Sequence, residues 1–238
     1  VAFNNQETLT KLMLRLATQL EPDTLSLNQA FTNDAFLLEN GLTKETALTL
    51  FIPNTYEFYW DTSAKKIANK MAKEHKKFWN ADRLAKAKLL NMTPAQVYTL
   101  ASIVHKETVK ADERPRVAGA YLNRIQQDMP LQADPTVIYA IKEKSGNFDQ
   151  IIKRVGGSNL FVKSPYNTYI NKGLPPGPIA MPDISAIDAV LNPEKHNFIY
   201  FCADPDRPGY HSFETNYEAH MINAKKYAAW VNKLGIKL

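Results

Sequence analysis

The sequence predicts an α+β fold that is mainly helical and contains one small antiparallel sheet. Apolar residues recur at helical spacing along most of the chain as far as Ile141. A proline-rich segment follows, and two short apolar runs then flank a turn near Arg207, which is the pattern of a β-hairpin. Hydrophobic residues make up 45% of the 238 residues and charged residues 22%, a globular composition that excludes intrinsic disorder and collagen-like structure.

We expect two parts, a mostly helical N-terminal lobe over residues 1–90 and a second domain over residues 91–238. In the lobe, helices are expected over residues 9–16, 27–36, 44–51 and 64–79. Pro53 interrupts the aromatic segment 51–60, which is not expected to form a regular helix. Residues 80–91 are expected to continue the lysine-rich helix before them or to form a linker.

The second domain begins with a helix that has a clear start signal. Thr93 is a candidate N-cap, Pro94 suits the first helical position, and Gln96 completes a capping box. Its apolar face begins at Val97, and the helix is expected to end over residues 108–110. The later expected elements are helices over residues 114–126 and 134–141, an ordered loop over 164–182, a helix over 184–191, a buried strand over 197–203, a return strand over 210–213 and an amphipathic helix over 217–234.

Glu107 is the most informative candidate for chemistry. It follows Val104 by three residues and Leu100 by seven, so it shares the helix face that carries the apolar stripe. A carboxyl in that position loses hydration, which raises its pKa towards the range that a general acid needs near neutral pH. The pattern alone leaves an alternative, a glutamate at a helix end that reaches solvent or pairs with a lysine or arginine.

Other polar residues are candidates for binding a ligand. They are Glu113, Asn123, Gln132, Asp134, Tyr166, Asn167, Thr168 and Tyr169. The last four lie on one loop and combine aromatic, amide and hydroxyl groups, a mixture typical of sugar sites. Glu113 is either a second active-site carboxylate or a first-turn acid that the helix dipole favours. Asp134 is either a ligand contact or the N-cap of its helix. Asn123 and Arg124 could bond a sugar or an adjacent loop.

No metal site or cofactor is expected. The five histidines form no tight ligand pair, and no phosphate-binding glycine motif is present. The single cysteine, Cys202, can form neither an intrachain disulfide nor a thiolate zinc site, and we expect it to be a small buried hydrophobe.

The charge balance favours an anionic partner without naming it. The chain has 29 lysines and arginines against 24 acidic residues, a formal net charge of +5, which suits a polymer, a membrane surface or nucleic acid. No nucleic-acid-binding motif is present, so nucleic acid is not expected as a partner. No apolar run approaches the length of a membrane span.

Several motifs stand in order along the chain. They are LASIVHKET (Leu100–Thr108), Glu113-Arg114, YLNR (Tyr121–Arg124), LQADPTVIY (Leu131–Tyr139), YNTY (Tyr166–Tyr169), GLPPGPIA (Gly173–Ala180) and HSF (His211–Phe213). Together they resemble the endolytic murein transglycosylase (YceG-like) family, over roughly residues 50–225. His105 departs from the family pattern, which has a glutamate there. Position 105 lies about 100° around the helix from Val104, so we do not expect this departure to affect the catalytic carboxyl.

The resemblance implies that residues 91–238 form a YceG-like catalytic domain. That domain would cleave the β-1,4 bond between MurNAc and GlcNAc in peptidoglycan and leave 1,6-anhydroMurNAc ends. Glu107 would act as general acid and then as general base, and the candidate binding residues would hold the glycan. Two alternatives stay open: a muramidase-type hydrolase with Glu113 or Asp134 as second carboxylate, and a non-catalytic peptidoglycan-binding scaffold.

The resemblance also implies a location and partners. We expect a bacterial cell-envelope protein anchored in the inner (cytoplasmic) membrane, with its catalytic part facing the periplasm or outer side. Its partners would be peptidoglycan glycan strands and peptidoglycan synthases, with membrane contact only through an anchor outside this chain. Family members carry a membrane helix and a LysM-like module, and residues 1–6 are expected to be the last strand of that module.

Overall fold

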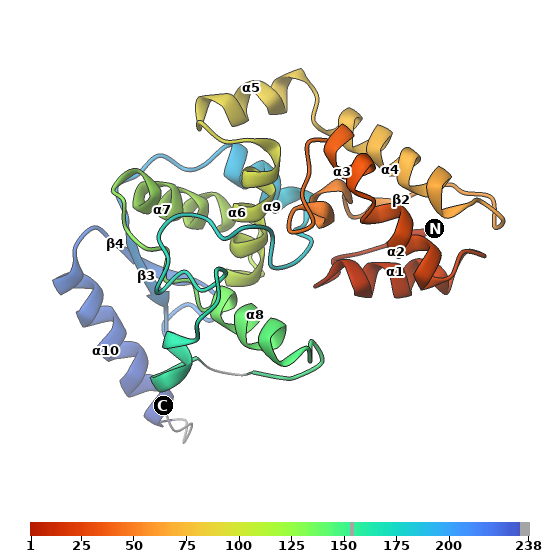
Figure 1. Ribbon diagram of the computed structural model, residues 1–238. Helices are drawn as coiled ribbons and strands as arrows, with labels where there is room; N and C mark the ends of the chain where they lie inside the picture. Colours follow the sequence, from red (N-terminus) through yellow and green to blue (C-terminus); the bar gives the residue numbers. More distant parts are fainter. Residues whose placement is uncertain (153–154, 234–238) are drawn as a thin grey trace.

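The computed structural model describes residues 1–152 and 155–233 and confirms a mainly helical α+β fold (Figure 1). Its α-helices are α1 (Leu9–Ala17), α2 (Thr24–Phe31), α3 (Asp34–Glu39), α4 (Ala64–Phe78), α5 (Ala81–Leu89), α6 (Pro94–Glu107), α7 (Arg114–Gln126), α8 (Asp134–Ser145), α9 (Ile184–Leu191) and α10 (Tyr217–Lys233). Two 3₁₀ helices are η1 (Ala47–Leu50) and η2 (Gly157–Phe161). Two antiparallel pairs are β1 (Ala2–Phe3) with β2 (Asn54–Thr55), and β3 (Tyr200–Ala203) with β4 (His211–Glu214).

The first strand belongs to the N-terminal lobe. Ala2 pairs with Thr55 and Phe3 with Asn54. That residues 1–6 are the last strand of a LysM-like module stays a prediction. Phe3 is buried and stacks on the ring of Tyr56. The lobe core beneath this pair is built from fully buried side chains of α1, α2 and α4, which are Leu12, Leu16, Leu27, Phe31, Ile67 and Met71.

Two asparagine N-caps start helices that the sequence analysis did not separate from their neighbours. The helix expected over residues 27–36 is interrupted at Asn33, whose side chain accepts a backbone N–H at the start of α3. Asn80 caps α5 in the same way, so residues 80–91 form a separate helix and not a continuation or linker. Residues 44–51 form only the short η1.

Helix α6 is the centre of the second domain. The predicted capping box is present, with reciprocal hydrogen bonds between Thr93 and Gln96. All side chains from Val97 to Val104 are buried, because α7, α8 and α9 pack around the helix. The predicted ranges of α7 and α9 are confirmed, and α8 continues to Ser145, beyond its expected end.

The hairpin β3–β4 lies at the edge of this domain beside α10 (Figure 1). Phe201 pairs with Phe213 and Ala203 with His211. Strand β3 starts at Tyr200 and not at residue 197 as expected. It is half-buried, whereas a buried strand was expected. A two-stranded sheet at an edge leaves much of its surface in contact with solvent. Leu234, the expected last helical residue, lies outside the described residues.

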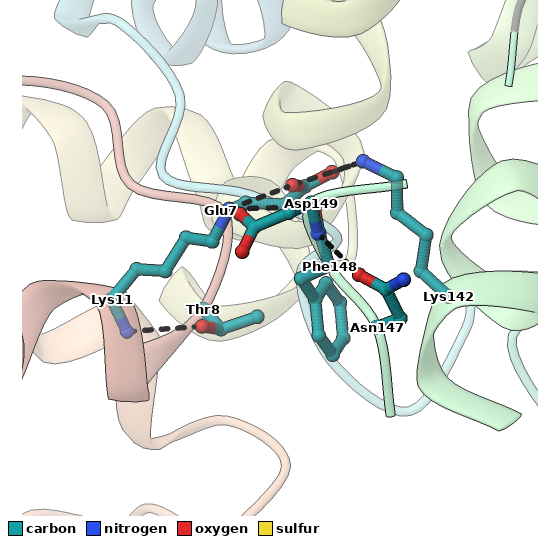
Figure 2. Close-up of polar contacts among 7 residues, drawn as sticks. All are labelled: Glu7, Thr8, Lys11, Lys142, Asn147, Phe148 and Asp149. Atoms are coloured by element: carbon teal, nitrogen blue, oxygen red, sulfur yellow. Dashed lines mark hydrogen bonds and ion pairs between the residues drawn. The ribbon is translucent and has the colours of Figure 1, made fainter. Parts of the chain in front are cut away.

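Ion pairs join the N-terminal lobe to the far end of α8 (Figure 2). Lys142 on α8 contacts Glu7 at 2.9 Å, and both side chains are largely buried. Lys11 on α1 contacts Asp149 at 2.8 Å. The buried side chain of Trp79 packs into the core around α6 and not into the lobe core. The domain boundary near residue 90 stays a prediction.

None of the described helices combines the length and the apolar composition that a bilayer crossing requires.

Candidate active site

A pocket of about 280 Å³ opens where α6 ends. Its walls come from α6, α7, the start of α8, the loop over residues 164–182 and the hairpin β3–β4. The lining residues are Glu107, Tyr121, Arg124, Gln132, Asp134, Tyr169, Phe201, Cys202, Ala203 and His211. Five segments that are distant in the sequence therefore meet at one carboxyl-bearing helix end.

The side chain of Glu107 occupies this pocket. Glu107 is the last residue of α6 and is half-buried. Burial raises the pKa of Glu107 to about 7, because the charged carboxylate loses solvation there. A hydrogen bond from Tyr121 and the charge of His211 favour the charged form but only partly offset burial. Glu107 can therefore both give and take a proton near neutral pH.

Tyr121 on α7 holds the Glu107 carboxyl in place. Its hydroxyl donates a hydrogen bond of 2.5 Å to Glu107 Oε1. The buried tyrosine ring packs edge-on against Phe201 of β3, with 5.5 Å between the ring centroids. Burial and the neighbouring carboxylate keep the pKa of Tyr121 well above its usual value, so the hydroxyl remains a donor. Its inward-facing helical position is the sequence signal for this contact.

Replacing Tyr121 by phenylalanine is expected to raise the pKa of Glu107 by about one pH unit, because a hydrogen bond to the charged form is lost. A carbon-13 NMR titration of the glutamate carboxyls measures this directly. Tyr98→Phe is the matched control, since the Tyr98 hydroxyl is bound to the Phe51 carbonyl. An unchanged or lower Glu107 pKa in Tyr121→Phe would contradict the assigned contact.

Glu113 does not line the pocket; it holds His211, which does. The Glu113 carboxylate accepts hydrogen bonds from the His211 backbone N–H at 2.7 Å and from its Nδ1 at 2.9 Å. A carboxylate only accepts, so Nδ1 carries the proton. Burial acts to raise the pKa of Glu113, but the bonds from His211 outweigh it and the pKa lies below its usual value. Glu113 thus fixes the ring that forms one pocket wall.

Three predicted binding residues line the exposed rim of the pocket. The Tyr169 hydroxyl donates a 2.6 Å hydrogen bond to Asp134 Oδ1. Gln132 has a left-handed backbone, with φ of 50°, and its N–H donates to the Thr168 carbonyl. The expectation that Asp134 is an N-cap is wrong. Ala133 is the N-cap of α8, and the Asp134 carboxylate is turned to Tyr169.

The other three loop candidates are buried and do not line the pocket. The Asn167 amide donates to the backbone carbonyls of Leu160 in η2 and of Val162 directly after it. The Thr168 hydroxyl accepts the Ala133 N–H and bonds the Thr136 hydroxyl, and the Tyr166 ring lies 4.6 Å from that of Tyr139. Buried backbone groups in a loop need partners, so these side chains hold the rim and leave its contacts to Gln132, Asp134 and Tyr169.

Two neighbours on α7 have different roles. The Asn123 amide donates to the carbonyls of His196 and Phe198, so it anchors the segment before β3 and does not face the pocket. Arg124 lines the pocket. Its buried guanidinium donates at 2.6 Å to the carbonyls of Ile199 and Leu131, which ties the hairpin to the turn before α8.

Comparison with known proteins gives the family. A model described as the YceG-like family matches residues 1–226. The chain belongs to this family. Its match extends over both the N-terminal lobe and the segments that build the pocket.

Curated relatives of this YceG-like chain are named endolytic murein transglycosylases. One, from Bacillus subtilis, is 32% identical over 213 residues, which cover 89% of this chain and 54% of the relative. Another, from Streptococcus pneumoniae, is 36% identical over 137 residues, which cover 58% of this chain and 24% of the relative. The chain thus spans about half or less of the length of these proteins.

A crystal structure of a YceG-like protein from Listeria monocytogenes has a similar fold. The TM-score is 0.77 at 29% sequence identity, and the match covers 93% of this chain and 74% of that chain.

The residue that departs from the YceG-like pattern lies away from the pocket. His105 Nδ1 is 3.3 Å from Asp183 Oδ2, and the same carboxylate contacts the Arg114 guanidinium at 2.9 Å. Burial lowers the pKa of His105. The helix therefore separates positions 105 and 107 onto different sides, as its geometry predicts.

Cys202 is the remaining correction. It is half-buried on β3 and lines the pocket, so the expected fully buried position is wrong. The short strand at the domain edge leaves one of its faces open to the pocket. Within residues 1–152 and 155–233, no cluster of three or more His, Cys, Asp or Glu side chains has metal-site geometry.

Proposed function

We propose that this YceG-like chain is an endolytic lytic transglycosylase of peptidoglycan, with Glu107 as general acid and then general base. One observation carries the proposal: a carboxyl with a pKa of about 7 lies in a pocket built by the segments that resemble the family's motifs. The names of the curated relatives support the reaction class. An envelope location, a membrane anchor and peptidoglycan synthases as partners belong to the same proposal and rest on the family resemblance.

The proposed reaction needs a single carboxyl. Protonated Glu107 donates its proton to the bridging oxygen as the bond from that oxygen to C1 of MurNAc breaks, and GlcNAc leaves with a free 4-hydroxyl. The MurNAc 6-hydroxyl then forms a bond to C1, and the Glu107 carboxylate takes its proton. The carboxyl returns to its starting state, and no water is consumed. Because the nucleophile is part of the substrate, its placement is intramolecular.

The surrounding residues fit these two proton transfers. Tyr121 orients the carboxyl through its hydrogen bond. Arg124 and His211 lie on the same pocket walls and favour the carboxylate form that exists between the two steps. The exposed Gln132 and Asp134 and the half-buried Tyr169 form a polar rim that can bind sugar hydroxyl and amide groups.

A muramidase-type hydrolase is the second candidate, because Asp134 lines the same pocket as Glu107. Hydrolysis of a glycoside requires a second carboxylate, to activate water or to form a covalent intermediate. The Asp134 carboxylate already accepts the Tyr169 hydroxyl, and Glu113 is bound to His211. This arrangement favours the single-carboxyl reaction.

Mass spectrometry of peptidoglycan fragments separates these possibilities. Purified peptidoglycan is incubated with the chain, and a parallel sample is digested with a known muramidase. We expect new internal cuts that end in 1,6-anhydroMurNAc. Reducing MurNAc ends would establish the hydrolase, and intact strands that still bind the chain would establish a non-catalytic scaffold.

The raised pKa of Glu107 also predicts a pH-dependent difference in stability. Ionisation is disfavoured in the folded state, so wild-type stability falls relative to Glu107→Gln as pH rises from about 4.5 to above 7. At pH 4 the ionisation of Glu107 should contribute little to the difference in the free energy of unfolding between the two proteins. That difference should grow by up to about 3 kcal/mol by pH 8.5. Urea unfolding of both proteins across this range measures this difference. A difference in unfolding free energy that stays constant or shrinks as pH rises would show that the pKa of Glu107 is not raised.

A further inference from the structure

Helix α4 carries a positive charge equal to that of the whole chain. Its sequence contains six lysines and one glutamate, a balance of +5, and the net charge of the chain is also +5. His75 adds no charge near neutral pH, because burial lowers its pKa to about 4. The remainder of the chain is therefore electrically balanced.

The six lysines occupy one side of α4. At 100° per residue they fall within an arc of about 140°. They are Lys65, Lys66, Lys70, Lys73, Lys76 and Lys77. All except the half-buried Lys70 are exposed. The opposite side, which includes Ile67 and Met71, is buried in the lobe core.

Few negative partners neutralise these lysines. Among the described residues, the ion pair on this helix joins Lys77 to Glu74. The loop before the helix adds two exposed acids, Glu57 and Asp61, which leave the balance of loop and helix at +3. A strong local positive potential remains.

Two large aromatic side chains are exposed beside the lysines. Tyr59 is 85% exposed and Trp60 is 65% exposed, both in the loop that leads into α4. This loop and the helix enclose an open hollow of about 740 Å³, lined by Phe58, Tyr59, Lys66 and Lys70 among others. Tyr59 therefore lies beside two lysines of α4, and the exposed Trp60 follows it directly in the same loop.

We propose that this α4 basic face, the six lysines with Tyr59 and Trp60, docks on the surface of a bilayer that contains anionic lipids. Lysines attract the phosphate headgroups, and Tyr and Trp are stable where the headgroups meet the acyl chains. A soluble polyanion offers no such apolar layer, which is why the exposed aromatics favour a lipid surface. In Figure 1 α4 and the hairpin β3–β4 lie on opposite sides of the molecule, so docking leaves the Glu107 pocket open.

Vesicle flotation tests the docking surface. We expect the chain to bind vesicles that contain phosphatidylglycerol and phosphatidylcholine and not to bind vesicles of pure phosphatidylcholine. High salt should release the bound chain. A variant with Lys65, Lys66, Lys73 and Lys76 changed to glutamine should bind at least about 30-fold more weakly. The matched control changes four exposed lysines elsewhere, Lys144, Lys163, Lys195 and Lys226, to the same net charge and should keep most of the binding.

Tryptophan fluorescence reports whether the aromatic residues enter the lipid interface. Wild-type emission should shift to the blue with anionic vesicles, and the shift should largely disappear in Trp60→Phe. Of the other two tryptophans, Trp79 is already buried, and Trp230 lies on α10, which is on the other side of the molecule from α4 (Figure 1). Absence of vesicle binding would overturn the proposal, including the case in which the chain binds only soluble polyphosphate. An equal loss of binding in the two four-lysine variants would also overturn it, since overall charge alone would then explain the attraction.

Discussion

Glu107→Gln is expected to lower the rate of glycan cleavage at pH 7 by about 10³-fold or more. Glutamine has the same shape and can still accept the Tyr121 hydrogen bond, but it can neither donate nor take up the proton. Both proton transfers of the proposed reaction depend on this one group, so no other residue compensates. Release of soluble fragments from purified peptidoglycan measures the rate.

The neighbouring Lys106→Gln supplies the control for this experiment. Lys106 lies on the same helix turn but is exposed and does not line the pocket. Its variant should cleave within about twofold of the wild-type rate. Circular dichroism and thermal unfolding confirm that both variants are folded. If Glu107→Gln kept more than a tenth of the wild-type rate, the acid would have to be another residue.

Gly177→Ala is expected to destabilise the fold strongly, although it adds only one methyl group. A Cβ atom at Gly177 would lie 2.1 Å from the Glu45 carbonyl oxygen and 2.7 Å from its carbonyl carbon. These are backbone atoms, so neither side can move without disturbing the contact between the 164–182 loop and the N-terminal lobe. We expect a loss of about 3 kcal/mol or more in the free energy of unfolding, or roughly 6–12 °C in melting temperature.

Gly156→Ala is the matched control for Gly177→Ala. Among the described residues, no atom lies within 4 Å of a Cβ built at Gly156, and its φ of 177° is extended backbone that any residue adopts. Its melting temperature should stay within about 2 °C of wild type. Equal stability of the two variants would show that the Glu45 contact is not close in solution.

Local signals in the sequence were sufficient for the centre of the second domain. The Thr93 cap defines the start of α6, and the apolar spacing after it places Glu107 on the inward side. Both are properties of one helix, so no knowledge of distant segments is needed. The long proline-rich loop was also predictable, because repeated proline excludes helix and central strand alike.

Contacts between distant segments could not be predicted in this way. His211 and Arg124 reach the pocket because the hairpin folds back onto α7, a relation that no local pattern shows. Asn167 resembles a sugar-binding amide in sequence, yet its side chain is bound to the backbone carbonyls of Leu160 and Val162, at the end of η2. Asn33 and Asn80 are the N-caps of α3 and α5. They were not predicted, because the apolar spacing around them is also compatible with a continuous helix.

Digestion of peptidoglycan in water labelled with oxygen-18 tests the central claim most directly. If the MurNAc 6-hydroxyl attacks and Glu107 moves the proton, the new ends are 1,6-anhydroMurNAc without the heavy isotope, and Glu107→Gln forms none. Reducing ends that carry oxygen-18, or the same anhydro ends from Glu107→Gln at the wild-type rate, would contradict the account.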